Sequence, residues 1–161
     1  MSRAGEIRLD WAGEPERLFR LGIGQVRKIQ EATGLGPTGI AARTMISMGV
    51  LKAIRDGDIE ALSRLDPTKT AEIGEVREVH LQGLLGADVA GPEALKLVRD
   101  WVEERPLAES LPSAYAIAMA AVLGPEDEGL GETTGEGTTA TPFPTESGAS
   151  PNSTAPEPSS A

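Results

Sequence analysis

The stretch Gly5–Gly34, GEIRLDWAGEPERLFRLGIGQVRKIQEATG, decides the fold because two alternating segments lead directly into an amphipathic helix. In the first segment the apolar side chains of Ile7, Leu9 and Trp11 alternate with charged ones. This two-residue period is typical of a half-buried strand. Residues 12–15, AGEP, then predict a turn, because glycine accepts a positive φ and proline lacks an N–H for a strand ladder.

The second alternating segment, residues 17–21, predicts a second strand and therefore a β-hairpin. At Gly22 the spacing of apolar residues changes from two to about three, which predicts a helix that ends at Gly34. The residues expected to face inward from this helix are Ile23, Val26 and Ile29. A hairpin and one helix cannot bury a core alone, so later helices must cover them.

The rest of the first 124 residues shows helical spacing interrupted by glycine, proline and aspartate. Helices are expected over residues 38–55, 58–65, 71–85, 91–105 and 111–123, with a kink allowed at residues 47–49. The first four of these helices have apolar faces that are expected to point inward: Ile40, Thr44, Met48, Leu51 and Ile54 in the first; Ile59, Leu62 and Leu65 in the second; Ile73, Val76, His80 and Leu84 in the third; Leu95, Val98, Trp101 and Val102 in the fourth. The last helix carries Tyr115, Ile117, Met119, Val122 and Leu123 among alanines. The predicted fold class is α+β, mostly α, with an N-terminal two-stranded β-hairpin followed by five or six helices.

Composition divides the chain into a domain, residues 1–124, and a tail, residues 125–161. The tail is rich in Pro, Gly, Ser and Thr and carries seven acidic residues and no Lys or Arg, so the net charge of −10 leaves −3 for the domain. With few large apolar groups, the tail is predicted to be disordered. It is interpreted as a solvating appendage or, alternatively, as a tether or partner-binding segment nucleated at residues 141–144, TPFP.

Several features indicate a soluble, cytoplasmic protein. The chain has no cysteine, which excludes disulfides and thiolate metal sites and fits a reducing compartment. The N-terminus has no apolar run that could serve as a signal peptide. No window approaches the roughly 20 apolar residues of a membrane span, so no membrane partner is expected.

A glycine pattern occurs at residues 34–39, GLGPTG, and Asp56 and Asp58 follow at about the distance of the ribose-binding acid in dinucleotide-binding folds. A phosphate loop should follow a strand and offer backbone N–H groups, whereas a helix precedes this segment and Pro37 has no N–H. The pattern is therefore interpreted as a helix end followed by a helix start, and no cofactor is predicted.

The acidic segment at residues 56–60, DGDIE, has two interpretations. Clustered carboxylates are typical of calcium loops, but the glycine and glutamate that such a loop requires are replaced by Ala61 and Pro67. A helix cap at Asp58 is favoured, and no metal site is predicted.

His80 is the only histidine, so neither a two-histidine metal site nor a Cys–His pair exists in the chain. It is interpreted as a part-buried structural residue because its helical neighbours are apolar. A general base acting with Glu75, Glu78 or a distant serine is the alternative, and it would make the protein a hydrolase. Without other convergent polar groups, we predict that the protein is not an enzyme.

Binding to nucleic acid is not expected either. The basic residues gather only in a local cluster with acidic residues nearby, and the acidic tail would repel a duplex. This cluster consists of Arg17, Arg20, Arg27 and Lys28.

Trp11 and Phe19, one on each predicted strand, have two interpretations. Large aromatic side chains are commonly core anchors. They are also candidate partner-binding residues, because a two-stranded sheet leaves an edge open for another chain.

Two segments carry a family resemblance: residues 20–37, RLGIGQVRKIQEATGLGP, and residues 91–125, GPEALKLVRDWVEERPLAESLPSAYAIAMAAVLGP. They resemble the opening and closing parts of small tail-assembly proteins of gene transfer agents and siphophage-like particles, a family linked to phage tail-assembly chaperones. Residues 45–70 are less similar to the family and are interpreted as an insertion.

The resemblance implies a tail-assembly chaperone or tail component that binds tail-tube and tape-measure proteins while a phage-like tail is built. It leaves open whether the protein is a homo-oligomer and whether it stays associated with the virion. Some family members carry a tail-tube label, but a tube subunit is expected to need a larger β-sandwich than one hairpin. The alternative is a non-viral helical adaptor or regulatory domain.

Overall fold

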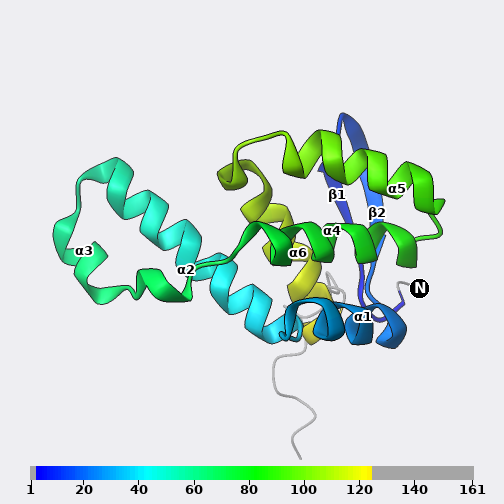
Figure 1. The fold of residues 1–161 in the computed structure, drawn as a ribbon, viewed down its shortest axis with the longest axis horizontal. Coiled ribbons are helices and arrows are strands. Elements are labelled where there is room, and N and C mark those ends of the chain that lie inside the picture. The colour runs from blue at the N-terminus through cyan, green and yellow to red at the C-terminus, as the bar shows by residue number, and fades with distance from the viewer. Residues whose placement is uncertain (1–2, 125–161) are drawn as a thin grey trace, which may run out of the picture. The chain divides into compact units, whose positions relative to one another are not determined.

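The computed structural model describes residues 3–124, and the prediction of a disordered tail concerns residues outside this range. Within it, an N-terminal antiparallel two-stranded hairpin is followed by six α-helices, as predicted (Figure 1). The elements are β1 (Glu6–Trp11), β2 (Glu14–Arg20), α1 (Ile23–Thr33), α2 (Pro37–Asp56), α3 (Ile59–Arg64), the 3₁₀ turn η1 (Pro67–Lys69), α4 (Ile73–Gly86), α5 (Gly91–Val98), the π-helical segment η2 (Arg99–Glu103) and α6 (Leu107–Leu123).

The hairpin turn is tighter than the sequence predicts. Trp11 pairs with Glu14, so only Ala12 and Gly13 form the loop, and both have positive φ angles, 56° and 73°. Two such residues match a type I′ turn, whose twist suits the right-handed twist of the strands. β2 therefore begins at Glu14 and not after Pro15.

A bulge follows the turn and accommodates the proline. The strand register shifts between Leu9 and Trp11, so that Pro15 and Glu16 together lie opposite Asp10. The Glu16 N–H donates a 3.0 Å hydrogen bond to the Asp10 carboxylate, and Glu16 has a φ of 52°. The bulge thus places Pro15, which has no N–H, at a position where no hydrogen bond to the opposite strand is required.

Exchanging Ala12 for asparagine should stabilise the protein. Asparagine tolerates a positive φ better than alanine does, so the free energy of unfolding should rise by roughly 0.5 kcal/mol. Gly13→Ala is the matched change in the opposite sense: its Cβ meets nothing within 4 Å, yet the φ of 73° should cost roughly 1 kcal/mol. Urea unfolding monitored by circular dichroism measures both, and a loss of stability in Ala12→Asn would contradict the turn assignment.

The helix ends follow their sequence signals in most places. Gly34 and Gly57 end α1 and α2 in the left-handed conformation, with φ angles of 75° and 66°. α2 runs unbroken through residues 47–49, where a kink was allowed. α6 begins at Leu107, one turn earlier than predicted, so Pro112 lies inside the helix and not in its first turn.

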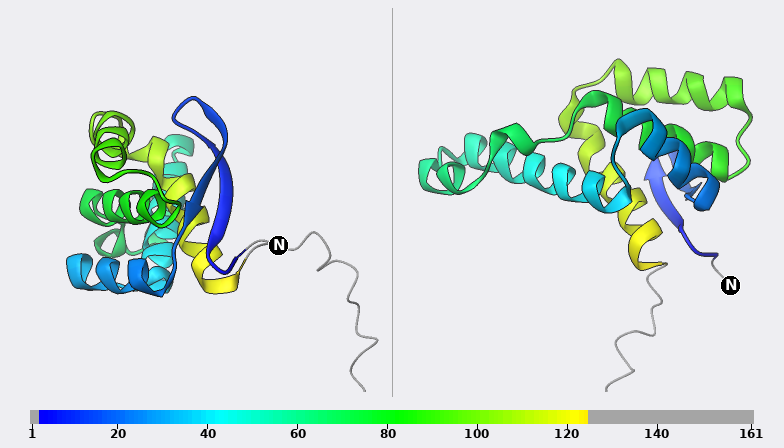
Figure 2. Two further views of the ribbon diagram at one scale, coloured as in Figure 1. Left: turned by 90° about the vertical axis from the view of Figure 1, so that its right-hand side faces the viewer. Right: turned by 60° about the horizontal axis from the view of Figure 1, so that its bottom comes forward.

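The helices cover one face of the hairpin, which Figure 2 shows standing on one side of the helical layer. α4 packs against β2, α1, α5 and α6, and α6 also contacts β1 and crosses α2. The residues with least exposure come from β2 and from the helices α1, α2, α4, α5 and α6, and they include Phe19, Ile29, Ile40, Val76, Leu84, Val98 and Ile117. The core therefore lies around α4.

Some residues expected to face inward are exposed. Ile23, Ile59 and Ile73 are 84%, 80% and 46% exposed, and each is the first residue of its helix. Helical spacing assigns a side chain to a face but does not tell whether a neighbour reaches as far as the helix end. The predicted inward position is thus wrong for these three residues, and also for Leu51, Ile54 and Leu95.

Candidate protein-interaction surface

The structure places both candidate partner-binding residues of the hairpin in the core. Phe19 is completely buried and Trp11 is 9% exposed. Their rings contact each other edge to face, with centroids 5.3 Å apart, and Phe19 lies beneath Gly83 of α4. This corrects the expectation that Trp11 and Phe19 are exposed contact groups: the apolar face of the hairpin is the face that α4 and α6 cover.

His80 lies in the same buried cluster. Its imidazole stacks on Trp11 at 5.4 Å between centroids, and its Nδ1 and Nε2 atoms each lie 2.7 Å from an oxygen, the Val76 carbonyl and Ser113 Oγ respectively. A carbonyl only accepts, so Nδ1 carries the proton and Ser113 donates to Nε2. Burial lowers the pKa of His80 from 6.5 to about 4, although the Val76 carbonyl opposes this shift, so the ring is neutral at pH 7.

The pair of Ser113 and His80 has the residue types of a nucleophile and its base, but the imidazole has no exposed surface. A general base must reach the proton that it removes from the substrate, and this ring is enclosed by Trp11, Phe19 and its own helix. His80 is thus buried more completely than the part-buried position predicted from the sequence, and both of its ring nitrogens are used in contacts inside the core.

The glycine pattern at residues 34–39 and the acidic segment at residues 56–60 both lie at helix ends in the structure. Gly34 ends α1 and Pro37 begins α2, so the glycine pattern is a helix end followed by a helix start. The Ala61 N–H donates a 2.9 Å hydrogen bond to Asp58, which confirms the N-cap of α3. Among residues 3–124, no group of three or more His, Asp and Glu side chains could hold a metal ion.

A projecting segment, residues 48–70, lies where the sequence analysis places an insertion, but neither its projection from the body nor its exposed apolar side chains were predicted. We call it the arm; it comprises the C-terminal half of α2, α3 and η1 (Figure 1). The Ala71 N–H donates a 2.7 Å hydrogen bond to the Ser47 hydroxyl, so the chain returns at Ala71 to the point where it left the body. Within the arm, Leu65 contacts Gly49 and Ala53 is buried.

A partly buried ion pair holds the base of the arm to the body. The Arg43 guanidinium on α2 contacts the Glu75 carboxylate on α4, and the exposed fraction of the Glu75 side chain is only 7%. Glu75 also accepts a 3.1 Å hydrogen bond from the N–H of Glu72. Removal of either charged partner would leave the other charge uncompensated. The pair is therefore expected to hold α2 against α4 at the base of the arm.

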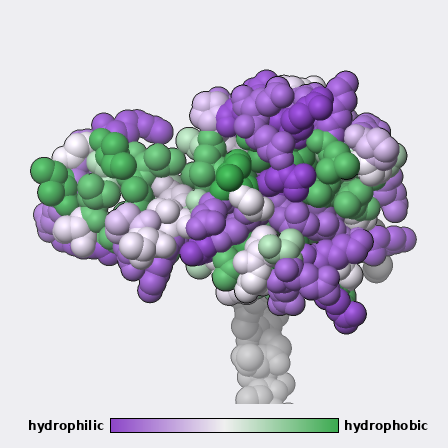
Figure 3. All heavy atoms as spheres, viewed as in Figure 1, coloured by the Kyte–Doolittle hydropathy of each residue, from purple (hydrophilic) through white to green (hydrophobic). Residues whose placement is uncertain are grey.

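The arm exposes apolar side chains that the sequence assigns to the core. Leu51, Ile54 and Ile59 are 36%, 61% and 80% exposed. On α2, Val50, Leu51 and Ile54 share one face of the helix, and the opposite face, with Gly49 and Ala53, is used inside the arm. Figure 3 shows apolar atoms gathered on one side of the arm. Such a contiguous exposed patch is typical of a protein-interaction site.

Two ion pairs form within the arm. Lys52 bonds Asp56 at 2.6 Å, and Arg64 pairs with Glu60 one turn away in α3. The hydrogen bond between Lys52 and Asp56 raises the pKa of the lysine and lowers that of the aspartate. With four basic and four acidic residues in residues 48–70, the arm has no net charge, so its apolar groups are its distinguishing feature.

Comparison of the chain with known protein families, curated proteins and solved structures finds no match. Among the described residues, no helix has the length and apolar character needed to cross a membrane.

Proposed function

We propose that this protein is a tail-assembly chaperone or tail component of a phage-like particle, and that it acts by binding tail-tube and tape-measure proteins in the bacterial cytoplasm. The observation that carries the proposal is the exposed apolar surface of the arm. Contact with a partner would remove the apolar side chains of the arm from water, which is favourable. This property is expected of a surface that keeps another polypeptide soluble.

The body and the arm have separate roles in this proposal. The two segments that resemble the tail-assembly family, residues 20–37 and 91–125, belong mostly to α1, α5 and α6 of the body. The arm corresponds closely to residues 45–70, which are less similar to the family. We infer that the body is the shared scaffold and that the arm selects this particle's own tail proteins.

Co-expression of the full chain with candidate tail-tube and tape-measure proteins tests the proposal. A complex with at least one of them is expected, together with improved solubility of that partner. Purified particles then distinguish a chaperone, which is absent from them, from a tail component, which remains. Failure to bind either protein when both are soluble would contradict the proposal.

Lysine substitutions in the arm should weaken this complex. Ile54→Lys and Ile59→Lys each remove an exposed apolar side chain worth roughly 1 to 2 kcal/mol on full burial, so each should raise the Kd about tenfold. Ile23→Lys is the matched control because Ile23 is 84% exposed on α1, away from the arm. Calorimetric titration measures all three. Equal weakening by Ile23→Lys would show that the arm is not the contact surface.

A further inference from the structure

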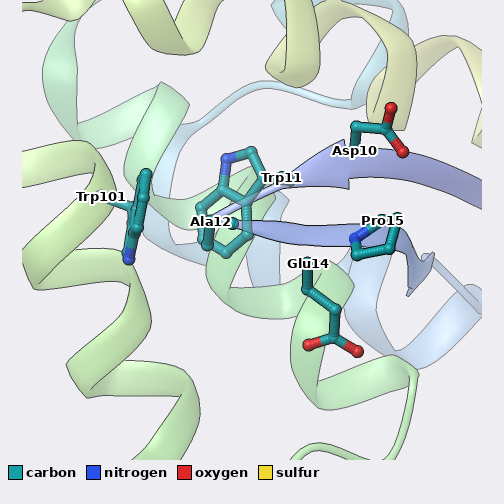
Figure 4. Close-up of a pocket in the computed structure, with 7 residues that line it drawn as sticks. Asp10, Trp11, Ala12, Glu14, Pro15 and Trp101 are labelled. Atoms are coloured by element: carbon teal, nitrogen blue, oxygen red, sulfur yellow. The ribbon is translucent and has the colours of Figure 1, made fainter.

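The two-stranded hairpin has two outer edges, and the edge of β2 is blocked at both ends. Pro15, which lines the open depression of about 440 Å³ at the hairpin tip (Figure 4), has no N–H to donate to another strand. At the other end, a Cβ added at Gly86 would lie 1.9 Å from the Arg20 carbonyl oxygen, so α4 lies directly against this edge. A further strand cannot pair along β2.

The main-chain groups of β1 point alternately to β2 and to the outer edge. The Leu21 N–H donates a 3.0 Å hydrogen bond to the Gly5 carbonyl. Bonded and non-bonded pairs alternate along an antiparallel ladder, so Arg8 and Asp10 direct their N–H and C=O groups away from β2. Among residues 3–124 no other strand pairs with β1. We call the outer side of β1, with the main-chain groups of Arg8 and Asp10, the β1 edge.

The helices cover the β1 side of the hairpin less completely than the β2 side. Ile7 and Leu9 are only partly buried, whereas Phe19, which pairs with Ile7, is completely buried. The Arg8 and Asp10 side chains on the opposite face are exposed. In the left-hand view of Figure 2, β1 is the outermost strand, on the side away from α4. The β1 edge is therefore the one available for another strand.

We propose that the β1 edge binds the β1 edge of a second copy of this chain, so that two hairpins form one continuous antiparallel sheet. Leu9 lies on the two-fold axis, opposite the partner's Leu9. On each side of the axis, Arg8 of one protomer exchanges main-chain hydrogen bonds with the partner's Asp10. The dimer also covers the exposed parts of Ile7 and Leu9. This contact is separate from the arm and does not require the tail-assembly role.

The alternating charges of β1 select this register. A shift by one residue would place Arg8 opposite the partner's Arg8, and like charges directly opposite are unfavourable. A shift by two residues would need the Glu6 N–H, which already donates to the Arg3 carbonyl at 3.0 Å. In the proposed register each Arg8 side chain lies opposite an Asp10 side chain of the other copy, so both symmetric pairs are attractive.

Both side chains keep capacity for this pairing. The Arg8 guanidinium donates to the Glu16 carbonyl at 3.4 Å, and the Asp10 carboxylate accepts the Glu16 N–H at 3.0 Å. A guanidinium has five N–H donors and a carboxylate has about four lone-pair sites, so each group can bond to the partner as well.

Sedimentation velocity of the full-length protein over a concentration series tests the proposal. We expect a dimer with a Kd of about 100 µM or tighter. Arg8→Pro removes an outward N–H without removing a bond to β2, so it should raise the Kd at least tenfold. A protein that stays monomeric up to this concentration, or an unchanged Kd in Arg8→Pro, would overturn the proposal.

Leu18→Pro is the matched control for this variant. Leu18 pairs with Arg8, and its N–H also points away from the neighbouring strand, but on the edge of β2. The Kd should therefore be unchanged, and circular dichroism with the urea midpoint verifies that both proline variants are folded. Equal weakening by Leu18→Pro in a folded protein would contradict the choice of the β1 edge.

A charge exchange tests the register. Arg8→Glu and Asp10→Lys each place like charges opposite each other on both sides of the axis, so each should raise the Kd about tenfold. An equimolar mixture of the two variants restores opposite charges and should form heterodimers. A mixture that associates no better than either variant alone would overturn the proposed pairing. Ile54→Lys, on the arm, should leave the Kd unchanged, and a loss of dimer there would assign self-association to the arm.

Discussion

Replacing Gly86 by alanine is expected to lower the free energy of unfolding by about 3 kcal/mol or more. A Cβ at this position would lie 1.9 Å from the main-chain carbonyl oxygen of Arg20, at the end of β2, and 3.2 Å from Cδ of Gln25. A main-chain oxygen cannot move aside as a side chain can, so α4 must shift away from the hairpin. Urea unfolding at constant pH measures the loss.

Two other glycines of α4 serve as graded controls. An added Cβ at Gly74 meets nothing within 4 Å, so Gly74→Ala should be neutral or stabilising by up to about 1 kcal/mol through helix propensity. At Gly83 the nearest atom is Cδ1 of Phe19 at 3.0 Å, a side-chain atom that can shift, so an intermediate loss is expected. If Gly86→Ala were as stable as Gly74→Ala, the close approach of α4 to β2 would be incorrect.

The stability of the protein should fall as the pH is lowered from 6.5 toward 4, with the loss traceable to His80. The unfolded imidazole binds a proton below pH 6.5, whereas burial keeps the folded imidazole neutral down to about pH 4. Stability is therefore full above pH 6.5 and is lost progressively as the pH falls toward 4. The difference between the two pKa values corresponds to about 3 kcal/mol over the whole window.

His80→Gln is the diagnostic variant for this effect. Its amide can still donate to the Val76 carbonyl and accept from Ser113, but it does not titrate. Because His80 is the only histidine, stability between pH 6.5 and about pH 5, above the range of ordinary carboxyl groups, should become nearly independent of pH. Unfolding midpoints across this range provide the measurement. An unchanged slope in His80→Gln would assign the pH dependence to other groups.

The sequence predicts the order of elements well because local signals define them. Alternation over Glu6–Trp11 predicts β1, and Gly34 marks the end of α1. The Asp58 cap and the burial of His80 follow from the same kind of reasoning. Each of these features depends on residues that are close together in the sequence, so a single sequence is sufficient to predict them.

The arm was not predicted because it depends on which elements meet. Helical spacing places Thr44, Leu51 and Ile54 on one broad apolar face of α2, yet only Thr44 lies where α6 and α4 cover that helix. The same limitation explains Trp11 and Phe19. Their alternation identifies the apolar face of the hairpin correctly, but periodicity does not tell whether that face meets a helix or a partner.

The closely packed body and the exposed arm support the proposed mode of action, in which the arm binds another protein. Gly83 and Gly86 of α4 let the hairpin and helix pack closely, and the Arg43–Glu75 pair and the Ser47–Ala71 bond hold the base of the arm. The arm is therefore presented in a defined direction with its apolar groups accessible. In the proposed mode of action, a partner binds the arm without disturbing the core, which would limit the cost of ordering on association.

Hydrogen–deuterium exchange of the protein, alone and in complex with the co-expressed tail protein, tests the central claim most directly. We predict that binding slows exchange in residues 48–70 and leaves β1, β2 and α4 unchanged. Slower exchange confined to the hairpin or to α1, with the arm unaffected, would contradict the assignment of the arm as the partner-binding surface.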